Sequence, residues 1–149
     1  MYNRAAAVEY ARKWALSYNP AYYHFGGIGG DCTNFISQCL FAGGQKMNYA
    51  ANGWFYINAE RRSPSWAGVN ELNAFLLSDH TVGPKAELSS LRMLEVGDII
   101  QLRQNPTRFN HSLIISRITQ SEIYVCAHSN DALDRPLSTY QYFELLHQS

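Results

Sequence analysis

The two halves of this chain follow different hydrophobic periods, and this change constrains the fold more than any other feature. In residues 3–17 the side chains Ala7, Ala11 and Trp14 recur at spacings of three and four, which predicts an amphipathic helix. From residue 97 onward, short stretches rich in β-branched and aromatic residues alternate with polar loops, which predicts antiparallel strands. Helices followed by strands predict an α+β domain with its helices packed on one sheet.

Other elements follow from turn and capping residues. Asp31 is a candidate N-cap for a helix that Gly43 and Gly44 would end. The chain of 149 residues has the length of one domain, so we expect residues 1–149 to form a single unit. The remaining expected elements are a strand or ordered loop at 54–57, a helix at 69–78, strands at 97–102, 111–118 and 122–128, and a strand or helical turn at 139–147.

Composition argues against several classes of function. The formal net charge is zero and the pI is near 7.0, whereas a nucleic-acid-binding protein usually carries a basic balance. We find neither an apolar signal-peptide core nor the roughly 18 apolar residues that a membrane span needs. The three cysteines form no CxxC pair, so we expect no zinc cage, no disulfide framework and no cofactor. We expect a monomer.

One cysteine stands in a context that favours chemistry. The stretch GGIGGDCTNF places Cys32 after a glycine-rich approach and at the start of the predicted helix. The unpaired N–H groups of a first helical turn favour a thiolate. The alternative is a buried packing cysteine, which is common, and we expect Cys39 and Cys126 to be core thiols of that kind.

Two histidines could serve such a nucleophile. His111 opens the apolar stretch HSLIIS, and His128 closes IYVCAHS. If the two stretches pair as an antiparallel hairpin, the histidines lie at the same edge as cross-strand neighbours. Nucleophile, base and orienting group are the three parts of a catalytic triad. A lone histidine at a strand end is more often an ordinary surface residue, so the joint arrangement with Cys32 carries the hypothesis.

The chain resembles a known group of proteins. The motifs YHFGG, GDCTNF, VGDIIQL, NHSLIIS and IYVCAHS resemble the NlpC-type peptidoglycan peptidases of the papain-like superfamily. The opening YNRAAAVEYARKWA, the stretch GGDCTNFISQCLFAGG and the motif SPSW resemble the bacterial putative amidase domain more closely, over nearly the whole chain. The resemblance implies a papain-like fold with a catalytic cysteine at a helix N-terminus.

The resemblance also implies roles for individual residues. It makes Cys32 the nucleophile, His111 the general base and His128 the third member, with Asn130 or Asp131 as alternatives for that third role. Tyr23 would lie beside the cysteine. Together with the Cys32 backbone N–H, either Tyr23 or a loop amide within residues 26–30 would bind the oxyanion, and Asn130 is a further candidate for contact with the substrate or oxyanion.

We therefore expect a cysteine amidase or peptidase that acts on bacterial cell-wall peptide or another amide through a thioester. The sequence leaves hydrolase and transferase chemistry both open. One alternative is a non-catalytic module that keeps the cleft to bind cell-wall peptide or glycan. Another, ranked last because its spacing matches no metal pattern, is a metal site of Cys32, His111 and His128. The location would be extracellular or cell-wall-associated for a domain of a secreted parent, and cytoplasmic otherwise.

Overall fold

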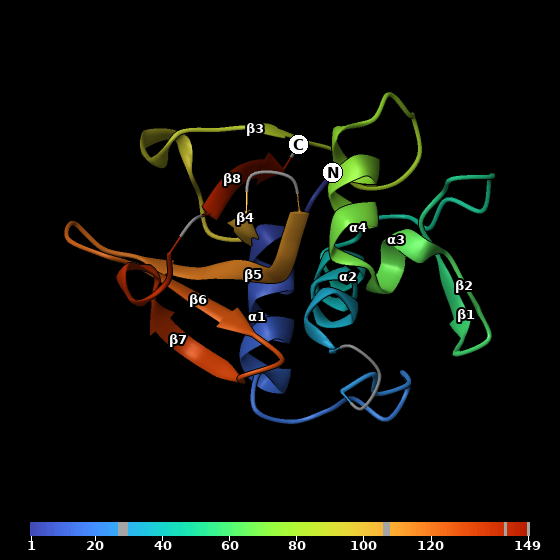
Figure 1. The fold of residues 1–149 in the computed structure, drawn as a ribbon, viewed down its shortest axis with the longest axis horizontal. Helices are drawn as coiled ribbons and strands as arrows, with labels where there is room; N and C mark the ends of the chain where they lie inside the picture. The colour runs from blue at the N-terminus through green and yellow to red at the C-terminus, as the bar shows by residue number, and fades with distance from the viewer. Residues whose placement is uncertain (27–29, 106–107, 142, 149) are drawn as a thin grey trace.

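Helices cover one face of a six-stranded antiparallel sheet (Figure 1). The computed structural model describes residues 1–26, 30–105, 108–141 and 143–148. The α+β class expected from the two periods is confirmed. The helices are α1 (Arg4–Trp14), α2 (Cys32–Ala42), α3 (Pro64–Ala67) and α4 (Val69–Leu77), with short 3₁₀ helices η1 (Leu91–Met93) and η2 (Leu137–Thr139).

The sheet has the order β3-β8-β4-β5-β6-β7, and every paired strand is antiparallel. Residues 139–147 were expected to form either a strand or a helical turn, and β8 shows that most of them form a strand. A separate two-stranded ribbon pairs β1 with β2. The strands are β1 (Tyr56–Asn58), β2 (Arg61–Arg62), β3 (Ala86–Leu88), β4 (Ile99–Asn105), β5 (Arg108–Ile118), β6 (Ile123–Ala127), β7 (Ala132–Pro136) and β8 (Phe143–Gln148).

The pattern of the sequence did not predict the two edge strands. β3 is three residues long, and β7 reads ALDRP, with two charged residues and a terminal proline. Short, charged and proline-containing strands are typical of sheet edges, where a strand has a neighbouring strand on one side only. Such strands lack the apolar alternation by which the central strands were found.

The first helix is capped by Asn3 and is shorter than predicted. The side chain of Asn3 accepts a hydrogen bond from the N–H of Ala6, 3.0 Å away. The helix ends at Trp14, three residues before the predicted boundary, and Ser17 closes a turn on the Trp14 carbonyl. The carbonyl of Trp14 thus lies in the last turn, where helical carbonyls lack intrahelical partners.

Two hydrophobic cores lie on opposite faces of the sheet. The first core, between helices and sheet, includes Ile114 and the fully buried Trp54 and Trp66. The sequence leaves open whether Trp54, Tyr56 and Trp66 line a groove or fill the core. The structure places the two tryptophans in the core, and the half-buried Tyr56 packs against it. The second core lies on the other face and includes Leu113 and Ile115. Because side chains alternate along a strand, odd-numbered residues in this part of β5 face away from the helices.

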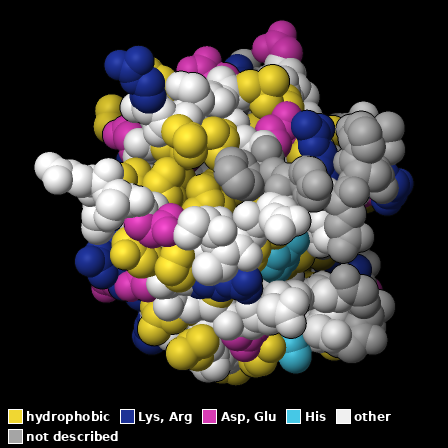
Figure 2. Space-filling view, turned by 60° about the vertical axis from the view of Figure 1, so that its left-hand side comes forward, with side chains coloured by type: hydrophobic (Ala, Val, Ile, Leu, Met, Phe, Trp, Pro, Cys, Tyr) yellow, Lys and Arg dark blue, Asp and Glu magenta, His cyan; other side chains and the backbone are white. Residues whose placement is uncertain are grey.

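The side that carries β3, η1 and β7 shows exposed hydrophobic residues between polar ones, among them Leu88, Leu91, Met93 and Leu133. Figure 2 turns the left-hand side of Figure 1 forward and shows hydrophobic side chains in this mixed distribution. Among the described residues, no helix is both long enough and apolar enough to span a membrane.

Candidate functional site

Helix α2 begins at Cys32, as the sequence predicts. The cysteine is 6% exposed, and Asp31 occupies the N-cap position. The predicted N-cap position of Asp31 is confirmed, but its carboxylate makes no hydrogen bond to the N–H groups of the first helical turn. One carboxylate oxygen instead accepts hydrogen bonds from the Phe25 N–H and the Asn34 amide, and the other lies against His128.

Hydrogen-bonding groups surround the Cys32 sulfur. The Thr33 hydroxyl lies 3.7 Å from Sγ, and the backbones of Thr33 and Ser112 also hydrogen-bond to the sulfur. These bonds lower the pKa of the Cys32 thiol, whereas burial and the Asp31 carboxylate raise it. Burial is the largest of these effects, so the pKa lies above that of an ordinary thiol. The Cys32 thiol is therefore protonated in this structure, and the surrounding Thr33 and Ser112 groups can hydrogen-bond to its thiolate form.

A chain of polar side chains leads from the sheet to this thiol. Gln101 Nε2 lies 3.2 Å from the Ser112 hydroxyl, which lies 2.9 Å from the Thr33 hydroxyl. Gln101 can only donate to Ser112. Ser112 can then donate to Thr33, and Thr33 to the Cys32 sulfur. All four residues are buried, so water does not compete for these groups.

Sequence reasoning missed the Thr33, Ser112 and Gln101 chain. The signal was the strand alternation of HSLIIS, in which Ser112 shares its face with Ile114, a residue of the first core. A buried polar residue in an apolar strand needs a partner, and Thr33 on the first turn of α2 supplies it.

His111 is adjacent to Ser112 but faces the other side of the sheet. Its ring centroid lies 6.5 Å from that of Tyr140, among the residues around the second core. Burial and the nearby Arg135 guanidinium lower the pKa of His111 to about 4. The imidazole is neutral at pH 7, as a general base must be. No hydrogen bond joins it to Cys32 in the part of the chain that the structure describes.

His128 lies on the helix side of the sheet. The predicted hairpin is present, and Ile114 pairs with Cys126. If the same register is extended by two residues, Ser112 lies opposite His128. His111 and His128 therefore lie at the same end of the β5–β6 hairpin, as expected, but they project from opposite faces of the sheet. Nδ1 of His128 lies 2.7 Å from Asp31 Oδ2, and Nε2 lies 2.6 Å from the Trp14 carbonyl oxygen. Both nitrogens are engaged away from His111, so the structure does not assemble the expected contact between the two histidines.

Tyr23 lies close to the Cys32 helix. Its backbone N–H donates to the Tyr56 hydroxyl, its carbonyl accepts from the Asn34 amide, and its side chain is 44% exposed. The ring, rather than the backbone, is thus available to a ligand. Asn130 and Asp131 are exposed in the turn after β6, where Asn130 has a left-handed backbone with φ of 67°.

Cys39 and Cys126 are fully buried, as core thiols should be. Within the described residues, no group of three His, Cys, Asp or Glu side chains is placed to hold a metal ion. The loop amides expected to bind the oxyanion include those of residues 27–29, which lie outside the described residues.

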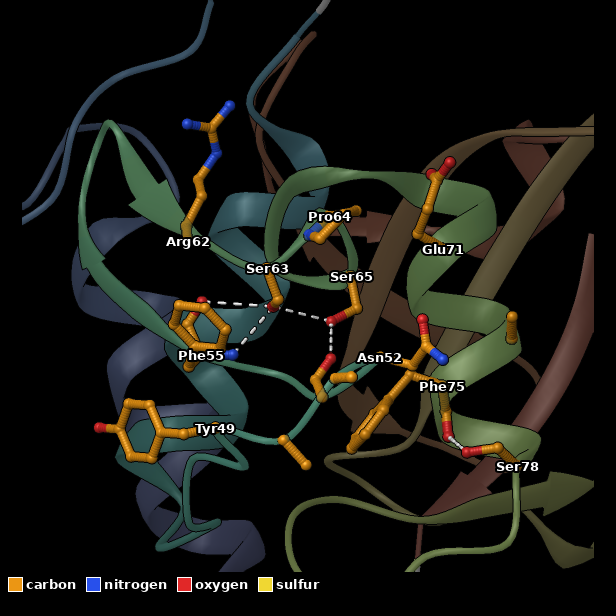
Figure 3. A pocket seen from close by; sticks show the side chains of 14 residues that line it. Tyr49, Asn52, Phe55, Arg62, Ser63, Pro64, Ser65, Glu71, Phe75 and Ser78 are labelled. Atoms are coloured by element: carbon orange, nitrogen blue, oxygen red, sulfur yellow. Dashed lines mark hydrogen bonds between the residues drawn. The ribbon is translucent and has the colours of Figure 1, made fainter.

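A cavity of about 670 Å³ lies apart from these residues (Figure 3). Aromatic side chains of Tyr49, Phe55 and Phe75 line it, and the buried hydroxyls of Ser63 and Ser65 form part of its wall. Ser65 donates to the Gly53 carbonyl and Ser63 to the Phe55 carbonyl, so both hydroxyls are satisfied within the protein. None of the expected catalytic residues lines this cavity.

Comparison with known proteins places the chain among relatives of unknown activity. The family described as "Putative amidase domain" matches residues 1–146. The uncharacterized protein YhbB of Bacillus subtilis is 38% identical over 119 residues, which cover 76% of this chain and 37% of YhbB. The uncharacterized protein YjcM of the same organism is 28% identical over 143 residues, covering 91% of this chain and 32% of YjcM. The chain thus spans about a third of the length of these relatives. No solved structure matches it significantly.

Proposed function

Because the chain belongs to the putative amidase domain family, we propose that it is a cysteine-dependent hydrolase that cleaves amide bonds with Cys32 as nucleophile. The observation that carries the proposal is the position of Cys32. Its sulfur lies at the first turn of α2 and hydrogen-bonds to the backbones of Thr33 and Ser112. Helix N–H groups and strand amides both favour a thiolate.

We assign His111 as the base, and this role requires a movement at the start of β5. The pairing of β4 with β5 shifts register between Leu102 and Arg103 and again between Arg103 and Asn105, next to the Leu102–His111 pair. A slip of one residue moves a side chain to the opposite face of a sheet. Such a slip would turn His111 toward Cys32 and away from Arg135, and it would also turn the Ser112 side chain away from Thr33.

The chemistry would then follow the thiol–imidazole pattern. His111 takes the thiol proton, and the Cys32 thiolate attacks the amide carbonyl. The oxyanion is bound by the Cys32 N–H and a second donor near Tyr23, and one such donor contributes roughly 3–4 kcal/mol in the transition state. His111 then protonates the leaving amine, and water hydrolyses the thioester.

As part of this proposal we place the domain in the NlpC-type branch of the papain-like superfamily, with bacterial cell-wall peptide as substrate. A helix that begins at the cysteine, followed by an antiparallel sheet with a histidine near the start of a strand, supports the assignment. The sequence motifs GDCTNF and NHSLIIS support the substrate class through the resemblance described above.

A binding module without catalysis is the second candidate. The raised pKa of the Cys32 thiol and the position of His111 on the other face of the sheet favour it. In that case Tyr23, with its exposed ring, would contact cell-wall peptide or glycan without cleavage.

One experiment separates the two candidates. Peptidoglycan is incubated with the wild-type chain, with Cys32→Ala and with Cys39→Ala, and the fragments are read by mass spectrometry. We expect new amine and carboxyl ends with wild type and Cys39→Ala, and none with Cys32→Ala. Retention of the chain on peptidoglycan by all three proteins, with no new ends, would support the binding module and overturn the hydrolase.

A further inference from the structure

His128 is enclosed by hydrogen-bond acceptors and aromatic rings. Its side chain is 1% exposed. Asp31 Oδ2 lies 2.7 Å from one ring nitrogen, and the carbonyl oxygen of Trp14 lies 2.6 Å from the other. A carbonyl oxygen can only accept, and so can an ionised carboxylate. Each nitrogen must therefore supply a proton for both contacts to be hydrogen bonds.

The partners of Asp31 indicate that its carboxylate is ionised. Its Oδ1 accepts two hydrogen bonds, from the Phe25 N–H at 2.8 Å and from the Asn34 amide at 2.9 Å. Donors directed at a carboxylate favour the charged form. The second proton of the pair then belongs to His128 rather than to Asp31.

The ring environment suits a cation. Phe35 stacks on the His128 ring at a centroid distance of 4.1 Å, and Tyr18 meets it edge-on at 4.7 Å. Cations are attracted to the faces of aromatic rings. The Trp14 carbonyl lies in the last turn of α1, and Asp31 stands at the N-cap of α2. A cation at one helix C-terminus and an anion at the other N-terminus complement both helix dipoles.

We propose that His128 is a buried imidazolium that acts as a positioning residue, joining the end of α1 to the start of α2 and neutralising the Asp31 charge beside Cys32. This inference rests on the proposed function only through the reactivity of Cys32. The charge state of His128 can be measured without any substrate. The role differs from the one expected from the sequence, in which His128 orients His111.

The charge state is tested by ¹⁵N NMR of the full chain with labelled histidine. His128→Gln assigns the resonance, and His24→Gln is the matched control, because the exposed His24 ring contacts Tyr18, which in turn contacts His128. We expect both nitrogens of His128 to carry a proton at about pH 7.5, because each of them faces a hydrogen-bond acceptor. A ring protonated on one nitrogen only would overturn the proposal.

Asp31→Asn keeps the test decisive if His128→Gln does not fold. The new amide can donate to Nδ1, so His128 needs only one proton, and we expect the doubly protonated signal to disappear at the same pH. If that signal persists in Asp31→Asn, Asp31 does not hold the charge and the proposal fails.

The positioning role is tested by alkylation of Cys32 with iodoacetamide, followed by peptide mass spectrometry. His128→Gln leaves the Asp31 carboxylate uncompensated, and we expect Cys32 to react about tenfold more slowly at fixed pH, which corresponds to one pKa unit. In the double variant Asp31→Asn/His128→Gln the carboxylate is absent, and we expect the rate to return to within about twofold of wild type. Equal rates in wild type and His128→Gln would overturn the positioning role and leave the hydrolase proposal standing.

Discussion

The Thr33 hydroxyl lies 2.9 Å from the Ser112 hydroxyl, and this contact joins the first turn of α2 to β5. Thr33 and Ser112 are 79 residues apart in the sequence, and both are buried. Both residues also hydrogen-bond to the Cys32 sulfur through their backbones, and Thr33 does so through its hydroxyl as well. The environment of the thiol is thus built jointly by the helix and the strand.

Replacing Thr33 by valine should weaken this environment with little change of shape. The variant removes the hydroxyl that lies 3.7 Å from the Cys32 sulfur, so the pKa of the thiol should rise further. We expect alkylation of Cys32 to slow by roughly tenfold at neutral pH, which is about one pKa unit. Thr119→Val, in the turn between β5 and β6, is the control and should leave the rate unchanged. Equal rates for both variants would show that the hydroxyl does not act on the thiol.

His111 should make stability depend on pH. Its pKa is about 4 in the folded chain against an ordinary value of 6.5, so the unfolded chain binds the proton more readily. The stability that the neutral imidazole contributes is complete above pH 6.5 and is lost as the pH falls toward 4. Allowing for solvent screening of a partly exposed ring, the loss should be on the order of 1–2 kcal/mol.

The measurement is urea unfolding at several values between pH 4 and pH 7 for wild type, His111→Gln and the exposed-site control His24→Gln. We expect a flatter profile for His111→Gln alone. If the profile of His111→Gln parallels that of wild type, the ring is not held neutral by the fold.

Asp98 should be among the most costly residues to truncate. Its fully buried carboxylate binds Arg4 at 2.7 Å and His147 at 3.0 Å, and it accepts the backbone N–H groups of Glu95 and Gln148. Asp98 thereby joins α1 to β8. Figure 1 shows these two elements, with the two chain ends close together. Removing one partner of a buried ion pair costs about 3–5 kcal/mol, so Asp98→Ala should lower the free energy of unfolding by about that amount.

Glu95 provides the comparison for Asp98 in the same network. Its carboxylate lies 3.6 Å from Arg4, but its side chain is 56% exposed. Exposed ion pairs contribute about 0–1 kcal/mol, so Glu95→Ala should be nearly neutral in the same urea titration. Similar losses for Asp98→Ala and Glu95→Ala would mean that the buried contacts of Asp98 are not the source of its effect.

Asn130 can be tested for a catalytic role without disturbing the turn. Ser129 and Asn130 both have left-handed backbones, with φ of 60° and 67°. Glycine adopts this conformation without strain, so Asn130→Gly should be neutral or stabilising by up to about 1 kcal/mol. Because the side chain is exposed in the turn, we expect the proposed cleavage of peptidoglycan to be as fast in this variant as in the wild type. A drop of tenfold or more in that rate would give Asn130 the orienting role instead of a structural one.

The sequence by itself determined most helices and the central strands, but not the edge strands β3 and β7. The spacing of apolar residues located α1, and apolar stretches located the central strands. Asp31 and Gly43 bounded α2 and so put Cys32 at its first turn. Each of these depends on residues within a few positions of one another, so a local pattern is enough. The hairpin of β5 and β6 was predicted for the same reason.

Only the tertiary structure decided which side chains meet. Whether His111 or Ser112 faces α2 depends on the register of β5 against its neighbours, and a shift of one residue exchanges the two faces. The partners of Asp31 include His128, which is 97 residues away in the sequence. This contact makes the Asp31 carboxylate part of a buried pair rather than a helix cap. Strand register and long-range pairing depend on how the whole sheet packs on the helices, and this packing leaves no local pattern in the sequence.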